Sequence, residues 1–498
     1  MSRTEVHTSG MHRRELLLAM GAGALGARHR WPTALLSDRA WRTDRPVPSP
    51  AQLAWQRDEL AIFVHFGVNT FTDREWGDGT EDPRIFNPSR LDAAQWVRAA
   101  RAGGFRTMIL TAKHHDGFCL WPTETTTHSV RSSPWRDGNG DVVREMVDAC
   151  RAEGLGVGLY LSPWDRHEPS YGDSPRYNDL YARQLTELLT RYGPLVEVWF
   201  DGANGEGPNG KRQEYDWPRV HRIVRELQPG ALMFSDAGPD IRWIGNERGV
   251  AGDPNWCPVD PTAVPYPGVS GDHITRALQH GDATGSVWRP GEADVSIRPG
   301  WFWHPAQDAE VRTPDNLTDL YFSSVGRNAG LLLNVPPTTS GLFQEADVRA
   351  LAGFGERLRR QFAIDLATSA VARSSGAPAR THGADRAIDD DPDTFWGAPE
   401  QSTAAAEPSW LELEWRRPVT FDTICIQEAI ALGQHVESHT VERWSGRGWA
   451  PLARGTTIGH KRLHRLSSAA TTTRVRLRVE STLGPTRISR IALHDGRS

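Results

Sequence analysis

Short apolar runs alternate with amphipathic stretches along most of the chain. Apolar runs with the length of a β-strand occur at residues 60–65, 107–111, 157–161, 195–200 and 232–235, and residues 91–102 have helical character. In two further stretches, apolar residues recur at i, i+3, i+4 and i+7, the spacing of one helix face. They are Val143, Met146, Val147 and Cys150, and Val220, Ile223, Val224 and Leu227. Strands that alternate with helices predict a parallel sheet.

The length of this region favours one kind of parallel sheet. About 300 residues suffice for eight strand–helix units. No glycine-rich phosphate loop follows any of the apolar runs, as it would in a dinucleotide-binding open sheet. The predicted fold class is therefore α/β, a (β/α)8-like TIM barrel at residues 50–368.

The pattern changes after about residue 340. A last helical stretch covers residues 345–366, and residues 373–379 have the composition of a linker. Beyond it, short apolar runs separated by turn residues occur at 410–415, 421–427, 440–444, 474–479 and 488–494. In the fourth of these runs apolar and charged residues alternate, which is typical of a sheet with one solvated face. We expect a C-terminal antiparallel β-sandwich at residues 372–498, separable from the barrel.

Charge and cysteine content argue against several classes of partner and site. The 498 residues carry 57 Lys and Arg against 62 Asp and Glu, a formal charge of −5, without a long basic run. Nucleic acid is therefore not an expected partner. The four cysteines are scattered without a Cys-x-x-Cys pair, which argues against a disulfide framework or a structural zinc site.

Residues 1–30 have the composition of an export signal. Arg13 and Arg14 precede an apolar run of small residues at 16–27, which is too short to span a bilayer. Two adjacent arginines before such a run indicate the twin-arginine route, so we expect a secreted or periplasmic protein. An ordinary N-terminal helix is the alternative. No other stretch is apolar enough for a membrane span.

Polar residues at the ends of the apolar runs are the candidate site residues, because the C-terminal ends of barrel strands build the active site. His65 ends the first run, residues 113–118 follow the second, residues 160–164 lie at the third and Asp201 follows the fourth. Asp201 stands between aromatic residues and Gly202, where its carboxylate is placed to attack an anomeric carbon. A cap of the next helix or turn is the alternative role for Asp201.

Histidine and tryptophan residues at the same ends suggest a ligand. Consecutive strand residues point to opposite faces, so the adjacent His114 and His115 chelate one ion only where the strand has already ended. We expect no metal here, and expect these histidines and His65 to bond sugar hydroxyl groups instead. Trp outnumbers Tyr by 20 to 8 and indole faces stack on sugars, so Trp76 and Trp199 are the aromatic candidates.

Several motifs occur in a specific order along residues 55–358. They are His65-Phe66-Gly67, Glu75-Trp76-Gly77, Lys113-His114-His115-Asp116-Gly117-Phe118, Trp199-Phe200-Asp201-Gly202, Trp243-Ile244-Gly245-Asn246-Glu247, Ser296-Ile297-Arg298-Pro299-Gly300-Trp301-Phe302-Trp303, Ser324-Val325-Gly326-Arg327-Asn328 and Leu331-Leu332-Leu333-Asn334-Val335-Pro336-Pro337. Through these motifs the chain resembles glycoside hydrolase family 29, the retaining α-L-fucosidases.

The resemblance implies a double displacement in which Asp201 is the nucleophile. It implies further that the histidines bind fucose hydroxyl groups, with the two tryptophans beside them. Residues of the same motifs and of the third apolar run complete the expected set. The substrate-binding residues predicted are His65, Glu75, Trp76, His114, His115, Tyr160, Trp199 and Arg298.

The general acid/base is the harder assignment. The fifth and sixth motifs resemble the subfamily that cleaves α-1,3- and α-1,4-linked fucose from branched glycans, and in that subfamily the matching glutamate is Glu247. Glu75 and Glu292 are competing acids. A surface carboxylate paired with Arg248 or Arg242 is the alternative for Glu247.

A second resemblance concerns residues 387–396, with the sequence Ala-Ile-Asp-Asp-Asp-Pro-Asp-Thr-Phe-Trp. They are similar to the opening loop of discoidin-type, galactose-binding-like sandwiches. Such modules bind glycans in some proteins and pack against the barrel in others. Their acidic loop often holds a structural calcium ion, although here Asp390 stands where glycine is common. No other cofactor is expected.

These observations favour an exo-α-L-fucosidase that acts on fucosylated oligosaccharides or glycoconjugates. Two other interpretations stay open at this point. One is a catalytically inactive glycan-binding protein that has kept the fold, and the other is a barrel glycosidase for another deoxy or acetamido sugar.

Overall fold

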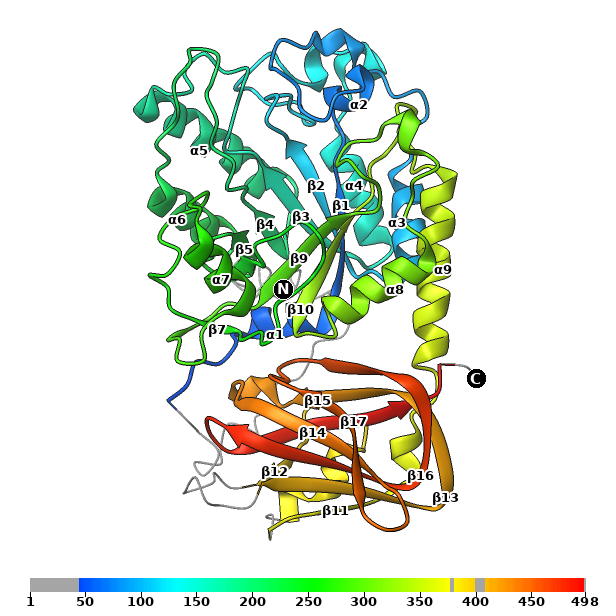
Figure 1. Ribbon diagram of the computed structural model, residues 1–498. Helices are drawn as coiled ribbons and strands as arrows, with labels where there is room; N and C mark the ends of the chain where they lie inside the picture. The colour runs from blue at the N-terminus through cyan, green and yellow to red at the C-terminus, as the bar shows by residue number, and fades with distance from the viewer. Residues whose placement is uncertain (1–43, 377–379, 399–407, 497–498) are drawn as a thin grey trace, which may run out of the picture. The chain divides into compact units, whose positions relative to one another are not determined.

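The computed structural model describes residues 44–376, 380–398 and 408–496. Within these residues, eight parallel strands close into a barrel (Figure 1), which confirms the predicted fold class. In the order around the barrel the strands are β1 (Leu60–Val64), β2 (Thr107–Lys113), β3 (Gly156–Leu161), β4 (Glu197–Trp199), β5 (Leu232–Ser235), β6 (Ile241–Trp243), β9 (Gly291–Ser296) and β10 (Ala329–Asn334). Closure is completed by pairing of β10 with β1.

Helices follow most of these strands and cover the outside of the barrel (Figure 1). They are α3 (Ala93–Gly103), α4 (Val142–Ala152), α5 (Ser174–Arg191) and α6 (Trp217–Leu227) after the first four strands, and α7 (Asp272–His280), α8 (Pro314–Ser323) and α9 (Glu345–Gln361) after the last three. Two short helices, α1 (Pro50–Asp58) and α2 (Val68–Thr72), flank β1. The connection between β5 and β6 comprises residues 236–240, all described, and contains no helix.

The helix α3 shows how the local sequence sets such an element. Asp92 caps its start, since the carboxylate accepts a hydrogen bond from the backbone N–H of Gln95 at 3.2 Å. Trp96 and Val97 lie on the buried face. The helix ends at Gly104, whose φ of 90° is the left-handed conformation that favours glycine at this position.

Three barrel strands, β6, β9 and β10, are not among the strands predicted from the apolar runs, although β10 contains the apolar residues Leu331, Leu332 and Leu333. β6 has only three residues, one of which is Arg242. β9 reads Gly-Glu-Ala-Asp-Val-Ser, and every one of these residues is buried. The acidic side chains of Glu292 and Asp294 interrupt the apolar run that marks the other strands. A strand that carries buried polar residues therefore escapes a search for apolar periodicity.

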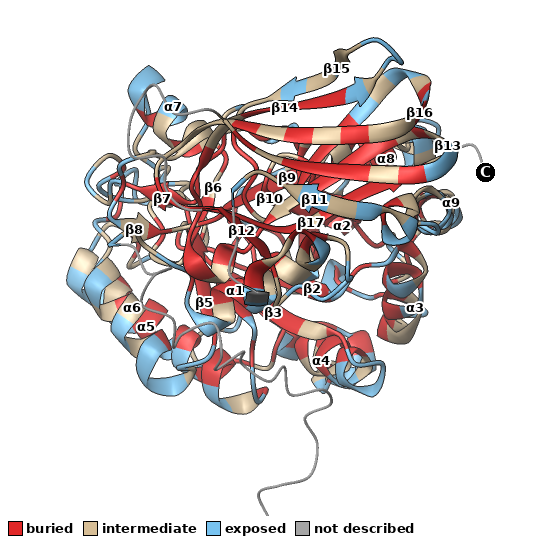
Figure 2. Cartoon of the chain, turned by 90° about the horizontal axis from the view of Figure 1, so that it is seen from below, coloured by how far each residue is buried: buried red, intermediate tan, exposed pale blue. Residues whose placement is uncertain are grey.

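The C-terminal region is an antiparallel β-sandwich, as predicted. Its strands are β11 (Val371–Ser374), β12 (Trp396–Ala398), β13 (Ser409–Glu428), β14 (Val436–Trp444), β15 (Trp449–Gly455), β16 (Arg462–Thr482) and β17 (Thr486–His494). The predicted strands at 410–415 and 421–427 form one strand, β13, with register shifts between Glu414 and Val419 and between Phe421 and Thr423. Buried and more exposed residues alternate along parts of β13 and β16 (Figure 2), so that one side of these strands packs into a core.

Two aspartates in the acidic loop of the sandwich form pairs with arginine side chains. Asp390 lies in an ion pair with Arg490, and Asp393 accepts a hydrogen bond from Arg57 at 2.6 Å. Within the described ranges, no group of three or more His, Cys, Asp or Glu side chains is arranged to hold a metal ion. A calcium ion in this loop stays a prediction.

The N-terminal prediction lies outside the described residues. It concerns residues 1–30, so a signal peptide and secretion or periplasmic export stay predictions. Among helices of the described part, none is both long and apolar enough to cross a membrane. Residues Thr43–Ser498 form one compact unit that includes the barrel and the sandwich.

Charged pairs join the barrel to the sandwich within this unit. Glu59, just before β1, forms an ion pair with Lys461 and accepts a hydrogen bond from His460 Nε2 at 3.0 Å. Burial alone raises the pKa of Glu59, but Lys461 and His460 hold it well below its usual range. Arg462 donates two hydrogen bonds to the carboxylate of Asp253, at 2.9 and 2.8 Å. The barrel carboxylates therefore depend on cations that belong to the sandwich.

We expect that a chain ending at residue 372 forms a less stable barrel than the full chain, contrary to the separable module that the sequence pattern indicates. Glu59 and Asp253 would lose Lys461 and Arg462, and the hydrophobic core of the barrel would lose Cys425, Leu463 and Ala492, which the sandwich contributes. Thermal unfolding followed by circular dichroism measures the difference. The full-length double variant Lys461→Ala with Arg462→Ala is the matched control and should lose part of the same stability. A truncated barrel that melts with the full chain would show that the sandwich is separable.

Candidate active site

A cavity of about 520 Å³ opens at the C-terminal ends of the barrel strands. The predicted site residues that line it are His65, Glu75, Trp76, His114, His115, Tyr160, Trp199, Asp201 and Glu247. They lie on chain segments far apart in sequence. They meet because each lies at or beyond the end of a strand in one closed barrel.

Asp201 lies two residues beyond β4 and is fixed by two hydrogen bonds. The Tyr160 hydroxyl donates to Oδ2 at 3.0 Å, and the backbone N–H of Ala203 donates to Oδ1 at 2.7 Å. Burial raises the pKa of Asp201, and the two hydrogen bonds act in the opposite direction. Two donors thus hold the carboxylate in one orientation and favour its ionised form.

Glu247 lies beyond β6 and enters the same cavity. The indole Nε1 of Trp301 donates to its Oε2 at 3.3 Å. Burial raises the pKa of Glu247, and the charges of Asp201 and Glu75 raise it further. The alternative pairing with Arg242 does not occur, because the Arg242 guanidinium donates to backbone carbonyls and to Asn255. A raised pKa suits a carboxyl group that must deliver a proton near neutral pH.

The three predicted histidines are buried and uncharged. Burial lowers the pKa of His65 and of His115 to about 3 and places that of His114 well below its usual value. His65 Nδ1 lies 2.8 Å from Asn334 Oδ1, an acceptor, so this nitrogen carries the proton. His114 and His115 both line the cavity because β2 ends at Lys113, immediately before them. A neutral imidazole has one donor and one acceptor nitrogen, and because Nδ1 of His65 is bonded to Asn334, its Nε2 remains as an acceptor for a ligand.

His115 has a tautomer that its neighbours determine. Its Nδ1 lies 2.8 Å from the Ser162 hydroxyl, and that hydroxyl donates its own proton to the carbonyl of Trp164 at 2.7 Å. His115 Nδ1 therefore carries the proton, and Nε2 is an acceptor 3.8 Å from Asp201 Oδ2. Two acceptors at this separation do not bond to each other. Their arrangement favours a ligand that brings a hydroxyl donor to this place.

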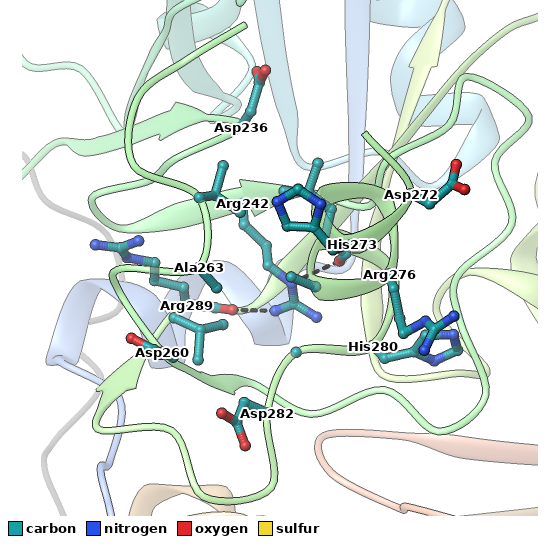
Figure 3. A pocket seen from close by; sticks show the side chains of 15 residues that line it. Asp236, Arg242, Asp260, Ala263, Asp272, His273, Arg276, His280, Asp282 and Arg289 are labelled. Carbon is teal, nitrogen blue, oxygen red and sulfur yellow. Dashed lines mark hydrogen bonds between the residues drawn. The ribbon is translucent and has the colours of Figure 1, made fainter. Parts of the chain in front are cut away.

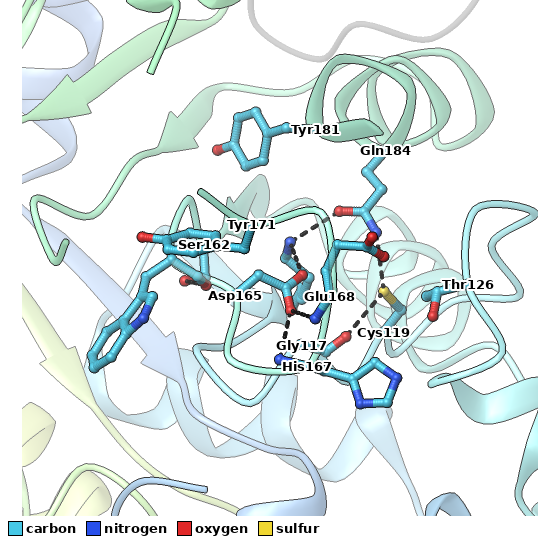
Figure 4. Close-up of polar contacts among 12 residues, drawn as sticks. Gly117, Cys119, Thr126, Ser162, Asp165, His167, Glu168, Tyr171, Tyr181 and Gln184 are labelled. Carbon is cyan, nitrogen blue, oxygen red and sulfur yellow. Dashed lines mark hydrogen bonds and ion pairs between the residues drawn. The ribbon is translucent and has the colours of Figure 1, made fainter. Parts of the chain in front are cut away.

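A buried ion pair holds the segments beyond β2 and β3. Lys113 Nζ donates to Asp165 Oδ2 and to Gln184 Oε1, each at 2.9 Å. Figure 4 shows that Asp165 also accepts the backbone N–H groups of His167 and Glu168, at 3.0 and 2.9 Å. The side chains of Lys113 and Asp165 are almost completely buried. This network fixes the loop beyond β3 and, through Lys113, the strand end that carries His115.

Glu75 fixes one wall of the cavity. Its carboxylate accepts the backbone N–H groups of Trp301 and Phe302, at 2.5 and 3.3 Å, and a hydrogen bond from His304 Nε2 at 3.0 Å. These bonds occupy both oxygens, so Glu75 is a weaker candidate for the acid/base role than Glu247. Its neighbour Trp76 is 55% exposed at the rim, where an indole face is open to a ligand.

Trp199 and Glu292 belong to the interior of the barrel. The Trp199 ring stacks on Phe234 with centroids 4.1 Å apart, and its Nε1 donates to Glu292 Oε1 at 2.9 Å. Burial and the charge of Glu197 raise the pKa of Glu292 well above its usual value. Glu292 is not among the residues that line the cavity, so it is not placed to act as the competing acid.

The position of Arg298 corrects the prediction that it binds substrate. Its side chain is fully buried and forms ion pairs with Asp347 at 3.0 Å and with Asp308 at 2.8 Å. Arg298 is not part of the cavity lining. The motif located a residue that fixes the loop beyond β9, because a buried guanidinium requires hydrogen-bond acceptors, which here are two carboxylates.

Two acidic residues of the cavity are absent from the predicted set. Asp236 follows β5 directly, and burial raises its pKa to about 6. The rule that located Asp201 beyond an apolar run also applies to Asp236. Asp294 on β9 accepts a hydrogen bond from Trp243 Nε1 at 2.7 Å. No apolar run marks this strand. Alternate residues of a strand face the same side, so Asp294 could have been inferred from its position two residues before Ser296, the last residue of β9.

A second cavity of about 660 Å³ adjoins the first at Asp236 (Figure 3). It lies beside α7 and the short strands β7 (Pro258–Val259) and β8 (Val287–Trp288), and its charged lining includes Arg242, Asp282 and Arg289. None of its described lining residues is Trp, Tyr or Phe, and none is a predicted site residue. The smaller cavity, with carboxyl groups facing aromatic rings, therefore has the chemistry of a sugar site.

Comparison with known families agrees with this assignment. A family model described as Alpha-L-fucosidase matches residues 40–361, and a model described as F5/8 type C domain matches residues 369–493. Alpha-L-fucosidase 1 of Arabidopsis thaliana is 45% identical over 455 residues, which cover 90% of this chain and 87% of the plant protein. A second protein described as an α-L-fucosidase, from Oryza sativa subsp. japonica, is 48% identical. The alignment covers 84% of this chain and 79% of the rice protein.

Solved structures give the same result. The crystal structure of SpGH29 superposes with a TM-score of 0.85 at 39% identity and covers 91% of this chain and 99% of its own. A GH29 fucosidase from Ruminococcus gnavus, solved in complex with fucose, has a TM-score of 0.82 at 33% identity and covers 92% of this chain and 96% of its own. Both likenesses extend over the barrel and the sandwich.

Proposed function

The chain belongs to the α-L-fucosidase family of glycoside hydrolases. We propose that it releases α-1,3- or α-1,4-linked L-fucose with retention of configuration. Its α-L-fucosidase activity follows from the family. The stereochemistry, the linkage and the branched glycan substrate are the proposal. The rival interpretations, an inactive glycan-binding protein and a hydrolase of another sugar, are set aside, because homologous fucosidases match most of the chain.

The observation that carries the proposal is the unequal environment of two carboxyl groups in one cavity. Asp201 accepts hydrogen bonds from Tyr160 and Ala203, which stabilise a carboxylate. Glu247 accepts only the long hydrogen bond from Trp301 among the described side chains and feels the negative charge of Asp201. Groups whose surroundings differ in this way suit a nucleophile and a proton donor.

The reaction follows from these roles. Asp201 attacks C1 of fucose while Glu247 donates its proton to the glycosidic oxygen, so that the aglycone leaves and a fucosyl ester of Asp201 forms. Glu247, now ionised, removes a proton from water, which attacks C1 from the face the aglycone has left. The ester bond breaks and the Asp201 carboxylate is restored. Two inversions at C1 give net retention.

The neutral histidines and the indoles suit the non-reacting part of the sugar. His65, His114 and His115 offer hydrogen bonds to hydroxyl groups without adding charge to the cavity. Trp76 at the rim and Trp199 in the wall supply apolar faces for C–H groups. In the Ruminococcus gnavus relative the bound ligand is fucose, which supports fucose as the sugar of this cavity.

We expect hydrolysis of a Lewis-type trisaccharide to be about tenfold faster than hydrolysis of 2′-fucosyllactose at equal concentration, because the branched substrate brings another sugar whose binding energy lowers the barrier. Proton NMR of the reaction reports the rate and the anomer released, and α-L-fucose should appear first. An aryl fucoside confirms that the preparation is active. Faster cleavage of 2′-fucosyllactose would contradict the linkage proposal, and initial release of β-L-fucose would contradict retention.

A further inference from the structure

We propose that Asp294 is a third carboxyl group of the active site, kept protonated, that donates a hydrogen bond from Oδ2 to a hydroxyl group of bound fucose. The inference rests on the proposed placement of fucose in the cavity described above. It does not depend on the linkage cleaved or on the stereochemistry of the reaction.

The strand β9 places Asp294 at the cavity. Alternate residues of a strand point to the same side, so Glu292, Asp294 and Ser296 share one side of β9. Glu292 bonds Trp199 within the barrel, and Ser296 bonds the carbonyl of Gly300 beyond the strand end. Between them, Asp294 lines the cavity although it is only 4% exposed. Because Asp294 is so deeply buried, we expect it to contact only the sugar residue bound deepest in the cavity.

The two oxygens of Asp294 have different surroundings. Oδ1 accepts the indole N–H of Trp243 at 2.7 Å. Oδ2 accepts no hydrogen bond from another described residue. It is also not among the side-chain atoms that are both inaccessible to solvent and without a partner, so Oδ2 is accessible. Oδ2 therefore keeps access to the cavity, and its hydrogen-bonding capacity is available to a ligand.

The charges around Asp294 favour its neutral form. The titratable groups that act on it are Glu247, from the loop beyond β6, and Glu292, on its own strand, and both are acidic. No Lys, Arg or His of the described residues is among the charged groups that act on it. Burial raises the pKa of Asp294 well above its usual value, in agreement with this arrangement. A neutral carboxyl group is a hydrogen-bond donor, which the ionised group is not.

The test compares Asp294→Asn with Asp294→Ala. The Asn carboxamide can accept the Trp243 N–H at Oδ1 and donate from Nδ2, as the protonated acid does, whereas Ala can do neither. We expect the inhibition constant of L-fucose to stay within a few-fold of wild type in Asp294→Asn and to rise on the order of ten- to a hundredfold in Asp294→Ala. Glu292→Gln is the matched control, since Glu292 also bonds an indole from β9 but does not line the cavity, and fucose binding should be unchanged.

Deoxy sugars separate a direct contact from a structural effect. In the wild-type protein, one of 2-, 3- or 4-deoxy-L-fucose should bind at least tenfold more weakly than L-fucose, and in Asp294→Ala that difference should disappear. A merely structural role would weaken all four sugars alike. If Asp294→Ala does not fold, Asp294→Ser takes its place.

Two results would overturn the proposal. One is fucose binding in Asp294→Ala equal to wild type, and the other is a loss in Asp294→Asn as large as in Asp294→Ala. Wild-type binding of L-fucose itself is measured independently, so a failure of the proposed sugar site is distinguishable from a failure of the role of Asp294.

Discussion

Replacing Asp201 by Asn or Gly is expected to lower kcat/KM for an aryl fucoside by about a thousandfold or more, which corresponds to roughly 4 kcal/mol of transition-state stabilisation. Neither side chain can form the fucosyl ester, so the covalent route is lost. The fold should persist, because Asp201 lies beyond β4 and only one of its two hydrogen bonds, from Tyr160 of β3, reaches a barrel strand. Steady-state kinetics and the circular dichroism spectrum measure both parts of this expectation.

Asp236 provides a matched control for Asp201. It follows the neighbouring strand β5, in register with Asp201 through the pairing of Trp199 with Phe234, and it lines the same cavity. Asp236→Asn also removes a carboxyl group but no ester-forming residue, so its loss of activity should be much smaller. Near-normal turnover in Asp201→Asn, or equal losses at the two positions, would exclude Asp201 as the nucleophile.

The Glu247→Ala variant is expected to be slow in deglycosylation and to regain turnover with azide. On an aryl fucoside with a good leaving group the first step needs little acid assistance, whereas attack by water needs a base. Azide is a small anion that needs no base, and because it attacks C1 of the fucosyl ester from the face that the aglycone has left, it should give α-L-fucosyl azide. Measuring turnover against azide concentration and identifying the product by NMR tests the role.

Glu75 is the control for this second experiment. Its carboxylate lines the cavity but is bound by the backbone of Trp301 and Phe302. Glu75→Ala should therefore lose activity through a displaced wall, without rescue by azide. Rescue in Glu75→Ala, or unchanged kinetics in Glu247→Ala, would assign the acid/base role to another residue.

The apolar runs of the sequence predict five of the eight barrel strands, and β9 escapes because it carries buried polar groups. β1 to β5 were predicted as apolar runs, and the spacing of Val143 and Met146 predicted the buried face of α4. The apolar pattern does not predict β9, because Glu292 and Asp294 replace apolar residues at inward positions. Their indole partners Trp199 and Trp243 are distant in sequence. Local periodicity contains no information about partners that only the closed barrel brings together.

The candidate site shows the same limit. Asp201 could be located because its position after an apolar run follows from barrel geometry, without knowledge of contacts. For Arg298 the motif supplied the residue but not its environment, and the structure places it with Asp347 and Asp308. Whether a polar side chain faces a cavity or a buried counter-charge depends on the tertiary packing, which a single sequence does not specify.

The charged contacts at Glu59 and Asp253 limit how such enzymes can be assembled by recombination. A gene fusion that supplied a different sandwich would have to bring cations to the positions of Lys461 and Arg462, or leave carboxylates facing an apolar partner. Exchange of the sandwich alone would therefore leave both carboxylates without their present partners. Chimeras built for glycan engineering should exchange the sandwich together with the α1–β1 turn and the loop that carries Asp253.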